Sequence, residues 1–315
     1  MPDLKQLRVL AAVAEAGSFS AAASALNYTQ PAVSRIVASL ERELGAVLVE
    51  RRCRPVRLTD AGGALVRHAD DVFARLSSAR AEIEAITRAD AGSVTLGTFG
   101  SAAATFVVQA LCEFRKQRPA VQVSLVEGMP SALVRRLRAG ELDIAVVFDF
   151  PAAGEDIGEG LELHHLLDQP FDIVLHPSHP LAGAERLRPA ELADETWLLQ
   201  DFGPQSPTVR LIGRMCAAAG FEPRVSFRVN DCHVILTMVA AGEGVSILPR
   251  LMLDASQREY VAKSVDGNTP IQRVAAVRLP NRYLSPAAAE LLTTVKDAAR
   301  RRADSWSGLD VGAAA

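Results

Sequence analysis

A group of polar and basic residues near the N-terminus has the chemistry needed to read a DNA duplex. Gln30, Ser34 and Arg35 lie on the side of a helical segment that is opposite its apolar stripe. Three arginines follow shortly afterwards: Arg51, Arg52 and Arg54. Hydrogen-bonding side chains can meet base edges in a major groove, and arginines in a turn suit phosphate contact or minor-groove insertion. The helical pattern alone is equally typical of a small bundle with a solvated face.

Two short helices are predicted before these residues. Leu4–Ala16 carries apolar residues at helical spacing and is followed by Gly17, a residue type that commonly ends helices. Ser18 can cap a second, alanine-rich helix over Phe19–Leu26. Small side chains on such a helix allow a neighbouring helix to cross it closely, as in a helix-turn-helix.

A third helix would present the polar side to DNA. Thr29 is an N-cap candidate, and Gln30 and Pro31 fit the first turn, where proline is tolerated because the first amides have no helical partner. The helix is expected to run to about Leu44. Its buried stripe would consist of Val33, Ile36, Val37, Leu40 and Leu44.

Two apolar segments around the arginines, Val47–Val49 and Val56–Leu58, predict a small hairpin wing. Residues 1–58 contain eight basic and five acidic side chains, a net charge of +3, whereas the whole chain of 315 residues has a net charge of -3. A basic end joined to an acidic remainder indicates a nucleic-acid module attached to another domain. A solvated hairpin is the alternative, but its position directly after the third helix favours DNA.

The next segment, 59–91, is interpreted as a linker helix and hinge. Thr59 can cap a helix that runs to about Arg88. Its apolar residues alternate at spacings of four and three, which is typical of a two-stranded coiled coil: Leu65, Ala69, Val72, Leu76, Ala79, Ile83 and Ile86. We expect this seam to form a dimer and so place two recognition helices on one duplex. An amphipathic helix packed on its own domain is the alternative.

From Val94 onward, strands and helices alternate, which predicts an α/β domain over residues 92–303. We expect two Rossmann-like subdomains around a cleft, with subdomain I over about 92–162 and 269–303 and subdomain II over about 163–268. Expected strands include Leu163–Leu167 and Phe171–Leu175, and the last helix is expected over Ser285–Arg302. Residues 304–315, small and polar, are expected to be disordered.

Several other kinds of chemistry are disfavoured. The four cysteines form no CxxC pair, and prolines around His176 and His179 prevent a helix from presenting both rings, so we expect no metal site. There is no Gly-x-Ser-x-Gly elbow and no P-loop lysine, so we expect no enzymatic activity and no cofactor. With no export signal and no long apolar run, a cytoplasmic protein without membrane contact is expected.

The N-terminal motifs resemble those of LysR-type transcriptional regulators. The resemblance is carried by Gly17–Ala23, Thr29–Arg35, Leu40–Gly45 and the segment from Leu48 to Gly62, with Val49 departing from the usual phenylalanine. It implies base contacts for Gln30, Pro31, Ser34 and Arg35. It also implies DNA-backbone contacts for Thr29, Arg51, Arg52 and Arg54.

The resemblance continues in the large domain through Gly140–Ala145, His179–Leu181 and Gly242–Pro249. It implies a fold similar to that of periplasmic solute-binding proteins, with a small effector bound in the cleft. It also implies a tetramer that binds promoter DNA, and RNA polymerase is a further candidate partner. Ligands of open α/β sheets bind beyond the strand ends, near helix N-termini. The residues expected there are Thr98, Phe99, Gly100, Ser101, Phe148, Phe202, Gln205 and Ser206.

This aromatic, hydroxyl-lined set favours a small, partly apolar carboxylate as the effector. As the alternative, phenylalanines at such positions are individually more often core residues than ligand contacts, and Ser101 could be no more than a helix cap. The leading hypothesis is therefore a ligand-responsive DNA-binding regulator. A solute-binding protein or enzyme with a basic assembly segment is the competing class. A constitutive regulator with a vestigial cleft is the third.

Overall fold

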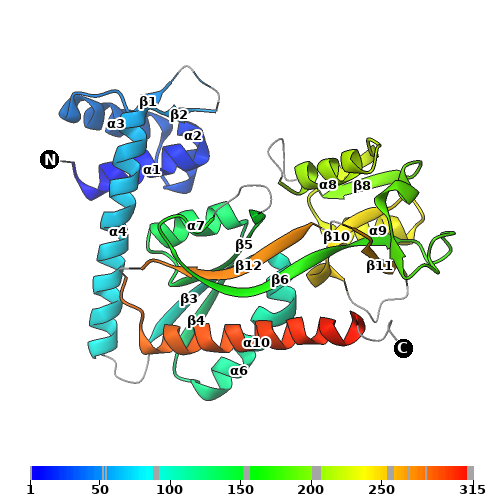
Figure 1. Ribbon diagram of the computed structural model, residues 1–315. Helices are drawn as coiled ribbons and strands as arrows, with labels where there is room; N and C mark the ends of the chain where they lie inside the picture. Colours follow the sequence, from blue (N-terminus) through cyan, green and yellow to red (C-terminus); the bar gives the residue numbers. More distant parts are fainter. Residues whose placement is uncertain are drawn as a thin grey trace. The chain divides into compact units, whose positions relative to one another are not determined.

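The computed structural model describes residues 2–51, 53, 55–87, 92–151, 157–200, 207–253, 259–267, 270–280 and 282–310 (Figure 1). Contacts divide the chain into two units. The first holds the N-terminal helices and the long helix that follows them, and the second holds nearly all of the α/β part.

Three helices build the N-terminal part as predicted: α1 (Leu4–Ala16), α2 (Phe19–Ala25) and α3 (Gln30–Leu44). Asp3 caps α1 through the Gln6 amide (2.7 Å), and the Ser18 hydroxyl caps α2 through the Ala21 amide (3.4 Å). Thr29 is the N-cap of α3 by its extended backbone, without a side-chain hydrogen bond. These caps satisfy amides that a helix itself leaves unpaired, so local sequence fixes the helix starts.

The turn between α2 and α3 depends on Asn27, whose φ of 56° lies in the left-handed region that asparagine tolerates. The Tyr28 amide closes the turn on the Ala23 carbonyl (2.8 Å). The three helices then share one core, which is made of fully buried side chains: Val9, Leu10, Val13, Val33, Val37 and Leu40.

The wing is an antiparallel pair of two-residue strands, β1 (Val49–Glu50) and β2 (Arg57–Leu58), shorter than the predicted segments. Helix α4 (Asp60–Thr87) begins directly after it. The Thr59 hydroxyl accepts the Gly62 amide (3.1 Å) and donates to the Val47 carbonyl (2.7 Å), which joins helix and hairpin. Gly62 is required there, because a Cβ would lie 2.0 Å from the Leu48 carbonyl oxygen.

The second unit contains an eight-stranded sheet. Its strand order is β4 (Gln122–Glu127), β3 (Ser93–Thr98), β5 (Ile144–Asp149), β12 (Ile271–Arg278), β6 (Glu162–Leu175), β11 (Val261–Val265) and β7 (Arg186–Leu187), and β10 (Ser246–Pro249) pairs with β6. Strands β3, β4 and β5 are parallel, in agreement with the predicted alternation of strands and helices. Between them lie a helical stretch and α7 (Pro130–Arg138). The helical stretch has three parts, α5 (Gly100–Ala102), the π-turn Ala103–Val107 and α6 (Val108–Gln117).

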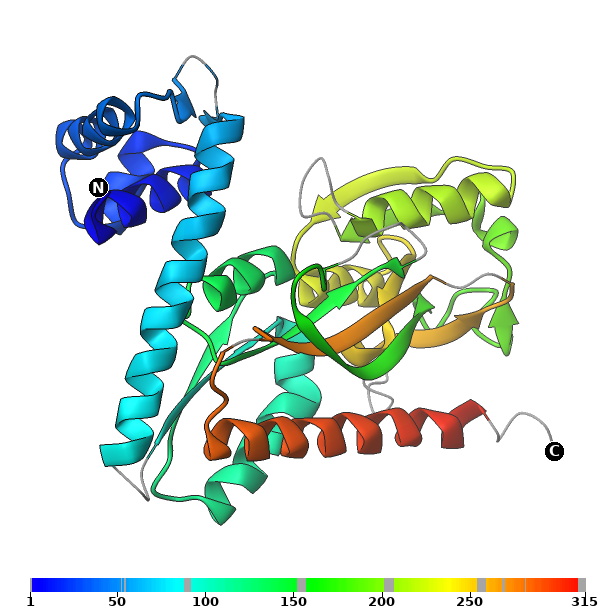
Figure 2. The same cartoon turned by 60° about the vertical axis from the view of Figure 1, so that its left-hand side comes forward.

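Strand β6 (Glu162–Leu175) was predicted as two strands but is a single element. Its first part pairs with β12 (Ile271–Arg278), and its last part pairs with β10 (Ser246–Pro249) and β11 (Val261–Val265). Figure 2 shows β6 and β12 running side by side across the domain. Because β12 also pairs with β5, the chain returns to its first half at the end, as predicted.

The second half also contains a two-stranded parallel sheet of β8 (Thr196–Gln200) and β9 (Arg224–Val229), with helices α8 (Pro207–Ala218) and α9 (Cys232–Ala240). Its remaining elements are β7 (Arg186–Leu187) and the short 3-10 turns Pro189–Leu192 and Arg250–Met252. Each half has its own core, one around Phe106, Phe114 and Val274, the other around Phe171 and Trp197.

The last helix, α10 (Pro286–Asp310), packs on α6 and is longer than predicted. The disorder expected over 304–315 is wrong for residues up to Asp310, because Trp306 is buried and gives this turn a packing partner. Residues 311–315 lie outside the described residues.

Candidate functional site

Helix α3 has a buried side and an outward polar side. Val33, Val37 and Leu40 are fully buried. The predicted DNA-facing residues lie away from them: Thr29, Gln30, Pro31 and Arg35 are exposed, and Ser34 is half-buried. The Arg35 Nε donates to the Pro31 carbonyl (3.3 Å), which holds the guanidinium along the helix surface. The structure thus brings these five predicted residues together on one accessible face.

Arg51 is held by three contacts with the helices. Its Nη2 lies 2.8 Å from the Glu41 Oε2, its Nη1 donates to the Ser34 hydroxyl (3.2 Å), and its Cζ lies 5.2 Å from the centre of the Phe19 ring. The guanidinium therefore connects the wing to α3 and α2, a holding role that sequence reasoning did not anticipate. Arg52 and Arg54, the other predicted wing contacts, lie outside the described residues.

Glu41 is the residue that completes this arrangement. Its Oε1 accepts the amides of Leu48 (2.9 Å) and Val49 (3.4 Å) while Oε2 pairs with Arg51. Burial raises the pKa of Glu41, but the hydrogen bonds with Arg51, Leu48 and Val49 outweigh it and bring the pKa below its usual value. The carboxylate is therefore charged at neutral pH and fixes the start of the wing on α3.

Two further exposed arginines, Arg42 on α3 and Arg57 on β2, lie on the described part of the same unit and were not among the predicted contacts. Tyr28, next to the start of α3, is also exposed, and the Lys5 ammonium lies 5.2 Å from its ring centre. A basic residue with an exposed aromatic ring next to a recognition helix suits contact with a DNA backbone.

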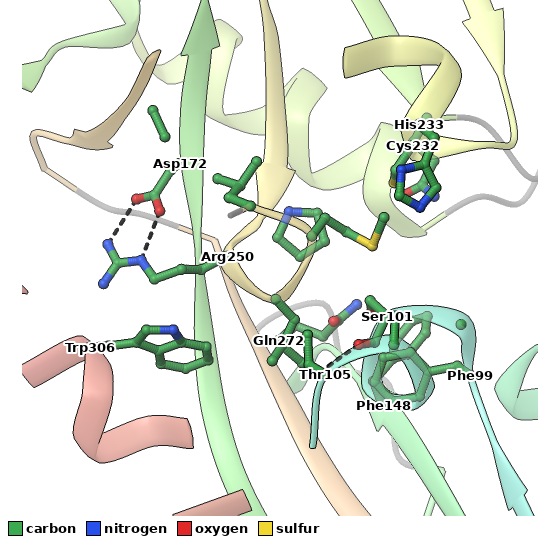
Figure 3. A pocket seen from close by; sticks show the side chains of 18 of the residues that line it. Phe99, Ser101, Thr105, Phe148, Asp172, Cys232, His233, Arg250, Gln272 and Trp306 are labelled. Atoms are coloured by element: carbon green, nitrogen blue, oxygen red, sulfur yellow. Dashed lines mark hydrogen bonds and ion pairs between the residues drawn. The ribbon is translucent and has the colours of Figure 1, made fainter. Parts of the chain in front are cut away.

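A cavity of about 1660 Å³ lies in the second unit, with walls from both of its halves. Four predicted effector residues line it: Phe99, Gly100, Ser101 and Phe148. Figure 3 shows Phe99 and Phe148 together at one end, where their rings meet edge to face at 4.9 Å. Thr98 is fully buried in β3, and the cavity's described lining does not include it; Phe202, Gln205 and Ser206 lie outside the described residues.

The end of the cavity near Ser101 is acidic. A Cβ on Gly100 would lie 3.0 Å from the Glu127 Oε1, so that carboxylate sits against the first turn of the α5 segment. Asp231, the N-cap of α9, also lines the cavity, next to Cys232 and His233. A ligand carboxylate at Ser101 would meet this negative charge, which argues against the carboxylate at this end that the sequence favoured.

The opposite end contains basic and aromatic side chains. Arg250 and Asp172 form a bidentate pair (2.7 and 2.8 Å), and Trp306 lies beneath the Arg250 guanidinium in Figure 3. Gln272 stands between the two ends in this view. Lys263 and Arg302 also line the cavity. Sequence reasoning missed all of these, because β11, the turn after β10 and the end of α10 meet only in the folded domain.

Comparison with known proteins identifies the family to which a chain with this helical unit and this cavity-containing domain belongs. Residues 4–63 match the bacterial regulatory helix-turn-helix family of LysR proteins, and residues 87–300 match the LysR substrate binding domain. The chain belongs to the LysR family of transcriptional regulators. It is therefore a DNA-binding regulator with a ligand-binding domain and not an enzyme.

Individual relatives agree with this assignment. The chain is 31% identical to the HTH-type transcriptional regulator CfxR of Cupriavidus necator, over 90% of this chain and 88% of that protein. It is 29% identical to MetR of Escherichia coli, over 88% and 85%. Among solved structures, full-length CbnR in complex with its target DNA has a TM-score of 0.56 at 25% identity, covering 94% of this chain and all of CbnR.

The buried thiols of this LysR regulator are not poised for thiolate chemistry. Cys232 lines the cavity, yet burial and the neighbouring Asp231 raise its pKa to about 12. Burial raises the pKa of Cys216 to about 11. Both remain protonated at neutral pH, and a thiol reacts through its thiolate.

Neither a metal cluster nor a membrane span occurs in the part of the chain that the structure describes. No group of His, Cys, Asp or Glu side chains among those residues could hold a metal ion. None of the described helices is long and apolar enough to cross a bilayer.

Proposed function

We propose that this LysR regulator reads promoter DNA through the outward face of α3, with Gln30, Ser34 and Arg35 at the base edges. The single observation that carries this proposal is the separation of these side chains from the buried Val33, Val37 and Leu40 on the same helix. Thr29, Arg51 and the exposed arginines would bind the DNA backbone. We propose that the regulator binds promoter DNA in the cytoplasm and that RNA polymerase is a further candidate partner there.

A gel shift on the DNA upstream of its own and neighbouring genes tests this proposal. Changing Arg35 to alanine should lower discrimination between the best site and a scrambled site by about 1–3 kcal/mol, as expected for a lost base contact. Arg42→Ala, the matched exposed arginine on α3, should weaken both DNAs equally. Equal weakening of the two DNAs by Arg35→Ala would show that this residue touches phosphate only.

We also propose that α4 forms the dimer. Among the predicted seam residues whose side chains the structure describes, Ala69 near the start of the helix is buried, whereas Val72, Leu76 and Ile83 are 39, 50 and 60% exposed. A row of exposed apolar residues at heptad spacing is what a second copy of the helix would cover. Leu76→Asp should shift the sedimentation coefficient to a smaller assembly, and Arg75→Asp, its off-seam neighbour, should not. Identical sedimentation of the two variants would contradict a seam at α4.

Two further apolar faces support pairing of ligand-binding domains into a tetramer. Val108 on α6 and Leu125 on the edge strand β4 are 46 and 41% exposed in the first half. Phe227 on β9 and Val234 on α9 are 40 and 44% exposed in the second. Edge strands with exposed apolar side chains are normally covered by a partner. Val108→Asp should convert the tetramer to a dimer in sedimentation experiments, whereas Leu76→Asp should disrupt the separate dimer contact at α4.

The effector is proposed to bind in the cavity between the two halves. Its walls come from elements of both halves, so a ligand there has contacts that depend on how the halves are arranged. A ligand changes an equilibrium only when its affinity differs between the two arrangements. Thermal shift against a metabolite panel tests this role, because a ligand that binds the folded state raises its melting temperature.

A further inference from the structure

Two glutamines are buried where β6 and β12 run side by side. Gln169 on β6 is fully buried, and Gln272 on β12 is 4% exposed. The two residues are partners in the strand register, and their side chains are hydrogen bonded to each other. The Leu251 amide extends this hydrogen-bond chain by donating to the Gln169 Oε1 (3.2 Å). Because buried polar groups in folded proteins are normally paired, the remaining amide atoms of this chain need partners as well.

The hydrogen-bond chain fixes how each side-chain amide is turned. A backbone N–H can only donate, so the Gln169 atom that faces Leu251 is the oxygen. The Gln169 Nε2 is then the donor to Gln272, and the acceptor on Gln272 is its Oε1. The Gln272 Nε2 keeps its N–H groups without an acceptor within the described part of the chain. Since Gln272 lines the cavity, a ligand there can supply that acceptor.

The strand register places Gln272 beside an aromatic pair. Val274 lies two residues further along β12, on the same face of the sheet, and its register partner on β5 is Phe148. The Phe148 ring meets the Phe99 ring edge to face at 4.9 Å. Both rings line the cavity together with Gln272 (Figure 3). A hydrogen-bond donor and an apolar aromatic surface therefore lie next to each other in the cavity wall.

The charges of the cavity disfavour an anion at this donor. The Glu127 carboxylate lies against Gly100, the residue that follows the aromatic pair's first ring in the chain. Arg250 and Trp306 lie at the opposite end in Figure 3, and the Arg302 Cζ lies 5.8 Å from the centre of the Trp306 ring. A carboxylate at the donor would be repelled by Glu127, whereas an uncharged oxygen accepts the hydrogen bond without that repulsion.

We propose that Gln272 binds an uncharged carbonyl oxygen of the effector, with a flat apolar part of the ligand against Phe99 and Phe148. This inference rests on the proposed effector role of the cavity. Gln272 then determines specificity, because a site built to hydrogen-bond one ligand group leaves its own polar group unpaired when a ligand lacks it.

Benzamide and benzamidine test this site, because both carry the same ring but only benzamide has a carbonyl oxygen. Their affinities for the full-length chain are measured by saturation-transfer NMR at constant ionic strength, with benzoate as the anionic probe. Gln272→Glu keeps an acceptor for Gln169 and replaces the donor by a second acceptor. It should lower the ratio of benzamide to benzamidine affinity about tenfold, the effect of one exchanged hydrogen bond. Gln122→Glu, the same change at an exposed position on β4, should leave the ratio unchanged.

Gln272→Met removes the donor without adding a charge, and it should weaken benzamide binding about tenfold while benzamidine binding is retained. An unchanged affinity ratio in Gln272→Glu overturns the proposal. Absence of benzamide binding to the wild type, or tighter binding of benzoate than of benzamide, also overturns it. Thermal shift against the metabolite panel, repeated on Gln272→Glu, separates this site from the general role of the cavity. A metabolite that stabilises both proteins equally supports the effector cavity and overturns the role of Gln272.

Discussion

Replacing Glu41 by alanine tests whether the wing is fastened to α3 as the structure indicates. The substitution removes the acceptor for the amides of Leu48 and Val49 and the partner of Arg51. Each lost amide hydrogen bond is worth about 0.5–1.5 kcal/mol, and the longer one at Val49 belongs at the low end. The Arg51 side chain is 41% exposed, so solvent screening limits the ion pair to less than about 1 kcal/mol.

These contributions add up to a local loss of about 2 kcal/mol, which corresponds to roughly thirtyfold faster exchange of the Leu48 and Val49 amides with deuterated water. Hydrogen exchange of the full-length chain is the appropriate assay, because it reports local opening in a protein of several domains. Glu41→Gln keeps an amide acceptor and should lose only about 0.5–1 kcal/mol. Glu50→Gln, an exposed acid on β1, is the control.

The same contacts predict a pH dependence. Because the folded pKa of Glu41 is lowered from 4.5, its stabilisation is complete above pH 4.5 and is lost as the pH falls through the lower folded pKa. Exchange rates of the two amides, corrected for intrinsic chemistry, should therefore rise below pH 4.5 in the wild type and stay flat in Glu41→Ala. Equal exchange in wild type and Glu41→Ala at pH 7 would refute the fastening role.

Two remaining predictions concern close packing and thiol reactivity. Gly62→Ala should disrupt the wing and abolish the gel shift, because the added Cβ would collide with the Leu48 backbone. Gly63→Ala should retain DNA binding, because its Cβ would lie 3.6 Å from the end of the flexible Arg67 side chain. Normal DNA binding by Gly62→Ala would contradict the close approach of helix and hairpin. Cys232 should resist iodoacetamide at pH 8 in the folded chain and react readily once the chain is unfolded in urea, as peptide mass spectrometry can measure. Equally fast alkylation of Cys232 in the folded and the unfolded chain would contradict its raised pKa.

The N-terminal unit could be predicted closely from sequence because its signals are local. Ser18 and Gly17 mark helix ends through their own hydrogen bonds and backbone angles, so the starts and stops of α1 and α2 follow from neighbouring residues. The role of Arg51 could not be predicted, since Glu41 and Phe19 approach it only after folding. The sequence of a basic turn does not distinguish an arginine that faces solvent from one, like Arg51, that holds the wing to the helices.

Non-local pairing also explains the errors in the large domain. Asp168, Gln169 and Pro170 interrupt the apolar pattern and suggest a break in β6, but β12 pairs across all three, and Gln169 is buried against Gln272. The small polar composition near Ser305 suggests disorder, whereas Trp306 packs and extends α10. Four of the residues expected at the strand ends line the cavity, but its charges come from segments that sequence pattern alone does not connect.

The strands that join the two halves restrict where a ligand can act. β6 and β12 both cross between the halves, and each is pinned at the crossing by a nearly buried aspartate, Asp172 with Arg250 and Asp149 with Arg273. Removing one member of a buried pair is strongly destabilising, so motion at these points is unfavourable. A change in arrangement must instead bend the strands between the pairs, next to Gln272.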